Sequence, residues 1–122
     1  MAAPNLVNVT SILGKSVGAA LGTNADTAIL TCASNKVLKI NSIIVANVDG
    51  TDSADLTVKF YDSSATTNYR LASTVAVPAD STLVVIGKDS PIYLEESDEI
   101  RAGAGVASDL EIVISYEELD DA

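Results

Sequence analysis

The nine residues Asp109-Leu-Glu-Ile-Val-Ile-Ser-Tyr-Glu117 alternate between apolar and polar side chains. Leu110, Ile112 and Ile114 share one face of an extended chain, because successive side chains of a β-strand point to opposite sides. Val113 is the one apolar residue on the other face. The pattern predicts a half-buried antiparallel strand, with one side against a core and the other toward solvent.

The same period of two recurs over residues 55–62, where Leu56, Val58 and Phe60 form the apolar face. Turn-forming residues separate such segments: Gly50 tolerates a positive φ, and Pro78 presets a turn. The other expected strands cover residues 27–32, 37–48, 69–77, 83–86, 91–95 and 99–102. About eight strands at this spacing predict an all-β fold, an antiparallel β-sandwich that is jelly-roll-like.

The segment 37–48 changes character along its length. One face is apolar except at Ser42, and the other begins with polar Lys39 and Asn41 but turns apolar at Ile43 and Val45. The second half is therefore expected to be covered on both sides, as is the apolar stretch 83–86. The cover is either another segment of this chain or a neighbouring subunit. The apolar residues expected on the same face as Ser42 are Leu38, Ile40, Ile44, Ala46 and Val48.

The composition disfavours several classes of function in this chain, namely nucleic-acid binding, membrane spanning and catalysis. The 122 residues have the size of one domain, and Val, Ile and Thr make up 33 of them, which favours strands. Seventeen acidic against seven basic residues give a net charge of -10, which repels nucleic acids and anionic membranes. No apolar stretch exceeds four residues, so no transmembrane helix is expected. Histidine, the commonest general base, is absent, so we expect no enzyme and no cofactor.

The first 22 residues differ from the rest. Glycines at positions 14, 18 and 22 interrupt them, and we expect either an extended arm or an edge strand, with a single sandwich domain over residues 23–122. An arm of this length reaches roughly 70 Å when fully extended. The start of the chain has no basic segment followed by an apolar one, so we expect synthesis in the cytoplasm without a secretory signal.

Two acidic segments are candidate sites. In residues 49–55, alternate positions offer oxygen ligands as a calcium loop does, but Ala54 and Phe60 stand where a Gly and a Glu are needed. A solvated turn is the preferred interpretation, with calcium left open and no metal residue assigned. Residues 95–99 are expected to form an exposed turn rather than a catalytic carboxylate pair, and the acidic end 117–121 a solvated tail or a contact with basic partner residues.

The remaining chemical candidates favour packing roles. Cys32 lies on the apolar face of its segment and has no histidine to activate it, so we expect a small buried side chain. Gly14-Lys15-Ser16 lacks the earlier glycine of a phosphate loop, since Val9 stands there. The four tyrosines are expected in the core or an interface, with sugar binding as a weaker alternative. No catalytic residue is assigned.

Several segments together resemble small virion structural proteins of tailed bacteriophages, especially those of cyanophages. They are Pro4-Asn-Leu-Val-Asn-Val-Thr10, Gly14-Lys15, Lys36-Val-Leu-Lys-Ile-Asn-Ser-Ile-Ile-Val-Ala-Asn-Val-Asp-Gly50 and Pro91-Ile-Tyr-Leu-Glu-Glu-Ser-Asp-Glu-Ile-Arg-Ala102. Such proteins often carry Gly in the acidic turn where this chain has Ser97. The resemblance implies a β-sandwich displayed on, or built into, a phage particle.

These considerations predict a head decoration protein on the outer surface of the capsid of a virion, where a negatively charged protein stays away from the packaged genome. The expected partners are the major capsid protein or other virion proteins, together with further copies in a homo-oligomer, with a trimer favoured. Alternatives are a neck, baseplate or tail-fibre adaptor, or a glycan-binding module. The residues expected to bind partners are Leu6, Val7, Val9, Ile12, Leu13, Ile43, Val45, Val84 and Ile86, the last four in the sandwich or subunit core.

Overall fold

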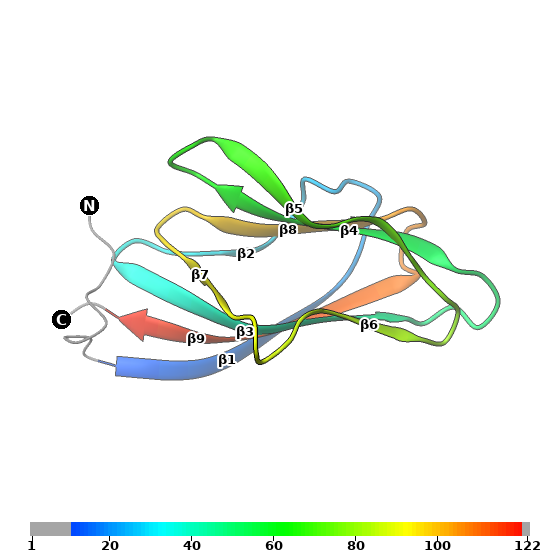
Figure 1. The fold of residues 1–122 in the computed structure, drawn as a ribbon, viewed down its shortest axis with the longest axis horizontal. Helices are drawn as coiled ribbons and strands as arrows, with labels where there is room; N and C mark the ends of the chain where they lie inside the picture. Colours follow the sequence, from blue (N-terminus) through cyan, green and yellow to red (C-terminus); the bar gives the residue numbers. More distant parts are fainter. Residues whose placement is uncertain (1–10, 121–122) are drawn as a thin grey trace.

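The computed structural model describes residues 11–120, which form two antiparallel β-sheets stacked face to face (Figure 1). This confirms the all-β sandwich expected from the sequence. The described residues form nine strands rather than about eight. They are β1 (Ser11–Ala20), β2 (Ala28–Thr31), β3 (Lys36–Asn47), β4 (Ala54–Asp62), β5 (Thr67–Val77), β6 (Thr82–Ile86), β7 (Ile92–Leu94), β8 (Glu99–Ala104) and β9 (Leu110–Asp120).

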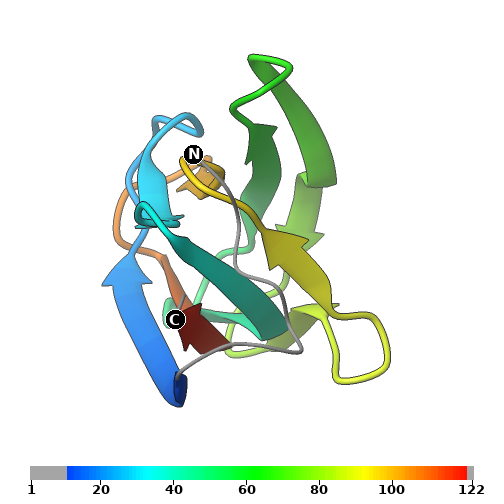
Figure 2. The ribbon, with the colours of Figure 1, turned by 90° about the vertical axis from the view of Figure 1, so that its left-hand side faces the viewer.

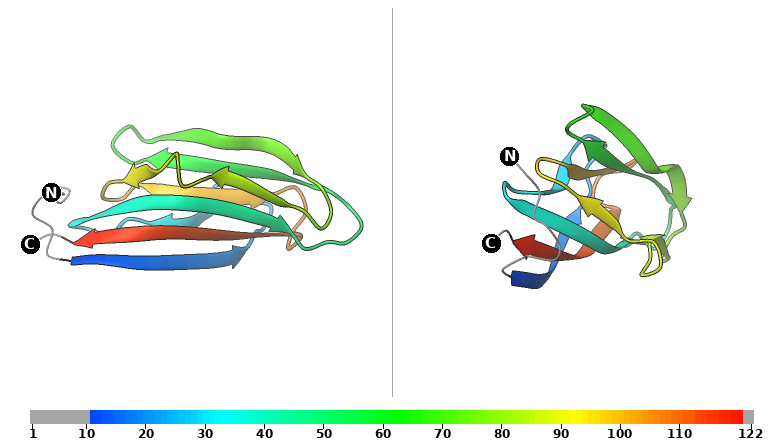
Figure 3. Two further views of the ribbon diagram at one scale, coloured as in Figure 1. Left: turned by 60° about the horizontal axis from the view of Figure 1, so that its bottom comes forward. Right: turned by 60° about the vertical axis from the view of Figure 1, so that its left-hand side comes forward.

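Each sheet combines strands from distant parts of the chain. The five-stranded sheet has the order β1-β9-β3-β6, and β7 pairs with the other half of the β3 edge that β6 occupies. The four-stranded sheet has the order β2-β8-β4-β5. The left panel of Figure 3 shows the two layers along their length, and Figure 2 shows β1 and β5 at opposite sides of the sandwich.

Strand β9 follows the alternation that predicted it. Leu110, Ile112 and Ile114 are fully buried, whereas Glu111 and Val113 are exposed. Their neighbours in the core come from both sheets and are mostly aliphatic, and each fully buried Leu, Ile or Val side chain stabilises the fold by about 1.5–3 kcal/mol. The largest fully buried core side chains are Leu21, Ile40, Ile43, Leu56, Leu94, Ile100, Leu110, Ile112, Ile114, Val45, Val58 and Val77.

A β-bulge in β3 corrects the expected assignment of its faces. Ile40 lies opposite Tyr116 and Ser42 lies opposite Ser115, so Asn41 is an extra residue in β3. An extra residue reverses which side chains point inward. The core therefore receives Leu38 and Ile40 before the bulge but Ile43 and Val45 after it. The prediction that Ile44, Ala46 and Val48 share the face of Leu38 is wrong, and Ile44 and Val48 are exposed.

The region expected to be an arm or an edge strand contains a strand within the described residues. All ten residues of β1 pair with β9, from Ser11 opposite Asp120 to Ala20 opposite Glu111. Gly14 and Gly18 therefore lie inside a continuous strand, at its edge position in the sheet. The first ten residues of the segment 1–22, which was expected to be an arm or an edge strand, lie outside the described part of the chain.

The acidic end is not a solvated tail as far as it is described. Residues 117–120 continue β9, because Leu119 keeps an apolar, buried side chain among the acids. Glu118 lies 3.2 Å from the Lys15 ammonium, and the Lys36 ammonium lies 3.1 Å from Asp120. The hydrogen bond and charge of Asp120 raise the pKa of Lys36, with Glu118 adding to the effect. Residue 121 lies outside the described part.

A glycine allows the loop before β2 to pack closely against β8. A Cβ atom at Gly103 would lie 2.7 Å from the Ala25 backbone, closer than real contacts allow, so only glycine leaves room for the segment before β2. Two backbone hydrogen bonds hold the ends of this loop on β8: Ala102 N donates to Thr27 O, and Ala104 N donates to Gly22 O. Among residues 11–120, no helix is long and apolar enough to cross a membrane.

Candidate protein-binding surfaces

The structure separates the residues predicted to bind partners into three groups. Leu6, Val7 and Val9 lie outside the described residues. On the edge strand β1, Ile12 and Leu13 are exposed. The third group, which was expected in the sandwich or subunit core, is divided between the inside and the outside of the sandwich.

Three residues of that group are unavailable to a partner. Ile43 and Val45 are fully buried, because the bulge in β3 turns their side chains toward the core. Ile86 on β6, which lies opposite Ile43, is nearly fully buried. These three residues belong to the sandwich core, which is one of the two locations expected for them, and as buried side chains they form no surface for a partner. Val84 alone of the group is exposed, with 57% of its surface accessible.

Val84 belongs to an apolar row on the outer face of the five-stranded sheet. Ile44 on β3 lies opposite Val84 on β6 and, on its other side, opposite Val113 on β9. All three are more than a third exposed. Side chains opposite each other on neighbouring strands lie within about 5.5 Å, so the three form one continuous patch. We call Val84, Ile44 and Val113 the outer row.

The outer row bears on the expectation that the second half of β3 is covered on both sides. Within the described residues, the three side chains of the outer row remain exposed, so this part of β3 is not covered on its outer side. Gly18 on β1 extends the row without a side chain, since it lies opposite Val113. The patch is therefore flat toward the edge of the sheet.

The outer face of the four-stranded sheet carries a second row, made of cations. Lys59 on β4 lies opposite Arg101 on β8 and opposite Arg70 on β5. Like charges that face each other across strands repel. Three of the seven basic residues of this acidic chain are therefore aligned side by side. We call Arg101, Lys59 and Arg70 the cation row.

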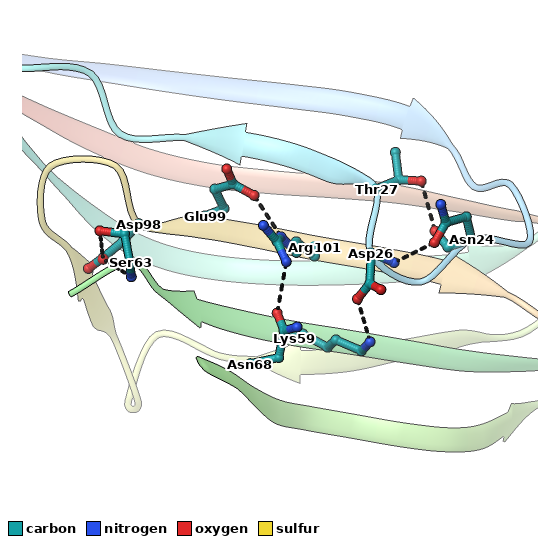
Figure 4. Close-up of polar contacts among 9 residues, drawn as sticks. All are labelled: Asn24, Asp26, Thr27, Lys59, Ser63, Asn68, Asp98, Glu99 and Arg101. Atoms are coloured by element: carbon teal, nitrogen blue, oxygen red, sulfur yellow. Dashed lines mark hydrogen bonds and ion pairs between the residues drawn. The ribbon is translucent and has the colours of Figure 1, made fainter. Parts of the chain in front are cut away.

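Two members of the cation row have acidic partners, as Figure 4 shows. The Lys59 Nζ donates to Asp26 Oδ1 at 2.7 Å, and Arg101 Nε donates to Glu99 Oε1 at 2.7 Å. Arg101 also lies 3.7 Å from the centre of the Tyr61 ring, a cation–π distance. Within residues 11–120 no carboxylate lies within ion-pair distance of the third member.

The positive charges of the cation row lower the pKa of Asp26. The hydrogen bond from Lys59 lowers the pKa of the Asp26 carboxyl, the charge of Lys59 lowers it further, and Arg101 and Arg70 add to the effect. At Asp26 the electrostatic effect of the nearby cations therefore exceeds that of the acids, although the net charge of the protein is -10.

An apolar groove opens beside β5. It has a volume of about 160 Å³ and is lined by Phe60, Tyr69, Leu71, Ile92 and Tyr93. The Phe60 and Tyr69 rings are stacked with their centres 6.5 Å apart, and Tyr69 and Tyr93 are each about half exposed. Two phenol hydroxyls are the polar side-chain groups of the lining. The groove can therefore receive an apolar side chain.

The acidic turn before β8 has a structural role. Asp98 is buried, which corrects the expectation that the whole turn is exposed. Its carboxylate accepts hydrogen bonds from Ser63 N, Ser63 Oγ and Glu95 N. Beside it, Ser97 has φ 68°, in the left-handed region that favours glycine. Ser97 therefore adopts a backbone conformation that glycine, the residue common at this place in the resembled proteins, adopts without strain.

The loop weighed as a calcium site forms a turn. Asp49 Oδ1 accepts a hydrogen bond from Thr51 N, and Asn47 Oδ1 accepts one from Asp49 N, as in Asx turns. Among residues 11–120, no cluster of three or more His, Cys, Asp or Glu side chains is arranged to hold a metal ion. Partial burial raises the pKa of the neighbouring Asp109, and the charges of Asp49 and Asp52 raise it further.

Cys32 is buried, as expected for a packing role. Its thiol donates to the carbonyl oxygen of Lys36 at 3.2 Å. Burial raises the pKa of the Cys32 thiol to about 11. The thiolate that a nucleophile requires is therefore scarce at neutral pH.

The cation row and the groove were missed at the sequence level. Alternation places Lys59 and Tyr61 on the polar face of their strand, but it does not show that Arg70 and Arg101 lie beside Lys59. Which pairs lie side by side depends on the strand order β8-β4-β5, which alternation does not give.

Comparisons with known proteins give no family. No protein-family model matches the chain, and neither does any curated protein. A search of solved structures finds the Clostridium thermocellum N-terminal endo-1,4-beta-D-xylanase 10B, with CBM22-1 and GH10 modules complexed with xylohexaose. The identity is 12%, the TM-score is 0.30, and the match covers 94% of this chain and 27% of that one. The chain thus spans about a quarter of the matched one, and so low a TM-score establishes no relationship.

Proposed function

We propose that this chain is a non-catalytic structural protein of a phage particle, namely a head decoration protein that binds the outer capsid shell and stabilises it. The outer row of Val84, Ile44 and Val113 carries the proposal. A continuous exposed apolar patch marks a surface that another protein covers, whereas single exposed apolar residues are ordinary. Each of these side chains contributes on the order of 1 kcal/mol when a partner covers it.

The partners are the major capsid protein or other virion proteins, together with further copies of this chain in a homo-oligomer, with a trimer favoured. A shell repeats the same junction many times, so a modest gain at each site sums to a large gain for the particle. A net charge of -10 favours the outer surface, away from the genome.

Binding to purified shells tests the role of the outer row. Shells assembled without this chain are mixed with the unaltered chain, with Val84→Asp or with Val106→Asp. Val106 is half exposed in the turn before β9, outside the outer row, and so provides a matched control. We expect Val84→Asp to fold normally but lose binding, and Val106→Asp to bind and to raise the heat resistance of the shells as the unaltered chain does. Equal binding of both variants would contradict the proposed surface.

A second structural location uses the same surfaces. A sandwich with an exposed sheet face and a β1 edge that no other described strand pairs with also suits an adaptor in the neck, baseplate or tail fibre. Copy number separates the two locations. Decoration predicts on the order of hundreds of copies per purified particle, since the shell is built from many identical subunits, and an adaptor predicts about a dozen or fewer. Absence of the chain from purified particles would refute both.

The groove with Tyr69 and Tyr93 favours one further candidate, a glycan-binding module on the virion. Exposed tyrosine rings can stack on sugars. The lining, however, offers few groups that could hydrogen-bond to sugar hydroxyls, so this candidate ranks below the structural role. It predicts saturable sugar binding that Tyr93→Ala abolishes.

A further inference from the structure

We propose that the free edge of β5 binds an extended segment of a partner protein in which acidic and apolar side chains alternate. Strand β5 is last in the order β2-β8-β4-β5, and β4 is its one partner strand within residues 11–120. Its outer edge therefore presents backbone N–H and C=O groups that an added strand can pair with. The inference rests on the proposed function only in that the partner is a protein.

The backbone of β5 limits the length of the added strand. Pairing with β4 is regular from Thr67 to Arg70, after which Leu71 is an extra residue. A second irregularity follows at Thr74, whose φ is 46°. Bulges bend an edge and interrupt further pairing. The added strand is therefore short, about five residues, and pairs beside Tyr69 and Arg70.

The inner side of this edge favours apolar side chains. Tyr69 and Leu71 line the groove from β5, and Ile92 and Tyr93 line it from β7. At about 160 Å³ the groove is smaller than the roughly 300–1,000 Å³ of typical small-molecule sites, and it suits one inserted apolar side chain of a protein.

The outer side of the same edge favours acidic side chains. The cation row ends at Arg70, the edge position, where an added strand would place its next residue. Opposite charges on neighbouring strands stabilise each other, so a carboxylate at that place extends the row favourably. Lys59 and Arg101 already have Asp26 and Glu99, which leaves Arg70 to pair with the partner.

The two sides together define the partner segment. Because successive side chains of a strand point to opposite faces, a segment that fills the groove and meets Arg70 alternates apolar with acidic residues. A second copy of this chain fits poorly: the described strands with a free edge, β1, β2, β5, β6 and β7, contain no acidic residue. The partner is therefore a different protein.

A peptide experiment tests this site on the full chain. The probe is an acetylated, amidated ten-residue peptide that alternates Val and Glu, and the controls alternate Val with Lys or Ser with Glu. We expect the Val–Glu peptide to slow hydrogen exchange of amides in residues 67–72, and both controls to bind at least about tenfold more weakly. N-methylation of alternate Val–Glu peptide bonds should abolish binding, because it removes the donors to the edge.

Matched variants test the charge separately from the fold. Arg70→Gln should weaken binding of the Val–Glu peptide by about two- to fivefold. Lys15→Gln, with the same charge change on β1 at the other side of the sandwich, should leave binding unchanged. Protection on β1 instead of β5, equal binding of the Val–Lys peptide, or no protection at millimolar peptide would each overturn the inference.

The outer row distinguishes this inference from the proposed function. Val84 lies on the other sheet, so Val84→Asp should still bind the peptide with unchanged affinity while losing the shell. If the peptide fails to bind but shell binding depends on Val84, the β5 site is refuted and the decoration function stands.

Discussion

Asp98 joins the turn before β8 to the loop of the β4–β5 hairpin through Ser63. One carboxylate oxygen accepts from the Ser63 backbone N–H at 3.0 Å and from its hydroxyl at 3.2 Å, and the other accepts from Glu95 N at 3.0 Å. The backbone of Asp98 also accepts a hydrogen bond from Cys32 N, at the end of β2. The side chain and backbone of Asp98 together thus connect three segments at this end of the sandwich.

Removal of this carboxylate should destabilise the protein. We expect Asp98→Ala to lower the free energy of unfolding by about 1–3 kcal/mol, because buried donors lose their acceptor. Asp89→Ala, at an exposed loop position, should change it by less than about 0.5 kcal/mol. Urea unfolding of both variants measures the difference. Equal effects of the two substitutions would show that the Asp98 contacts contribute little.

Replacement of Ser97 by glycine should stabilise the folded protein. A non-glycine residue in the left-handed region costs roughly 1–2 kcal/mol, and Ser97 has φ 68°. We expect Ser97→Gly to raise the free energy of unfolding by up to about 1 kcal/mol, since the greater freedom of glycine in the unfolded chain offsets part of the relief. Ser90→Gly, in an exposed turn without a positive φ, should instead be neutral or slightly destabilising. Thermal unfolding compares the two variants.

The sequence predicted strands far better than their faces and neighbours. Alternation placed Leu110, Ile112 and Ile114 correctly, because β9 contains no irregularity among these residues. In β3 one extra residue, Asn41, reversed the pattern, and such a bulge leaves no distinct signal in an apolar stretch.

The candidate sites depended on long-range pairing. Val84 was predicted as a partner-binding residue from its own apolar segment, but Ile44 and Val113 join it only through the strand order β6-β3-β9. The cation row likewise requires β8, β4 and β5 to be neighbours. Local sequence patterns contain no record of which strands pair, so these surfaces emerge only from the fold.

Cys32 should resist modification in the folded protein. Its buried thiol has a pKa raised to about 11, and the reactive thiolate is therefore rare at pH 8. We expect alkylation by iodoacetamide at pH 8 to proceed at least about a hundredfold more slowly in the native chain than in urea, because the ordinary thiol pKa is about 8.5 and burial also limits access. Mass spectrometry of timed samples measures both rates. Rapid native alkylation would show that this region opens readily.

Two carboxyl groups should respond to pH with opposite signs. Partial burial and the charges of Asp49 and Asp52 raise the pKa of Asp109, so its charge opposes folding at neutral pH and the penalty disappears as pH falls through its folded-state pKa. Lys59 lowers the pKa of Asp26, so its charge supports folding above its unfolded-state pKa, and this support is lost as pH falls through the folded-state pKa.

Asparagine substitutions separate these two effects. At pH 7 we expect Asp109→Asn to raise the free energy of unfolding and Asp26→Asn to lower it, each relative to the unaltered chain. Both differences should shrink toward zero as pH falls toward about 2, where carboxyl groups of ordinary pKa are protonated in both states. Urea unfolding at several pH values measures them, and each variant serves as the control for the other. A difference of the same sign for both variants at pH 7 would mean that loss of negative charge, not the local environment of each carboxyl, controls stability.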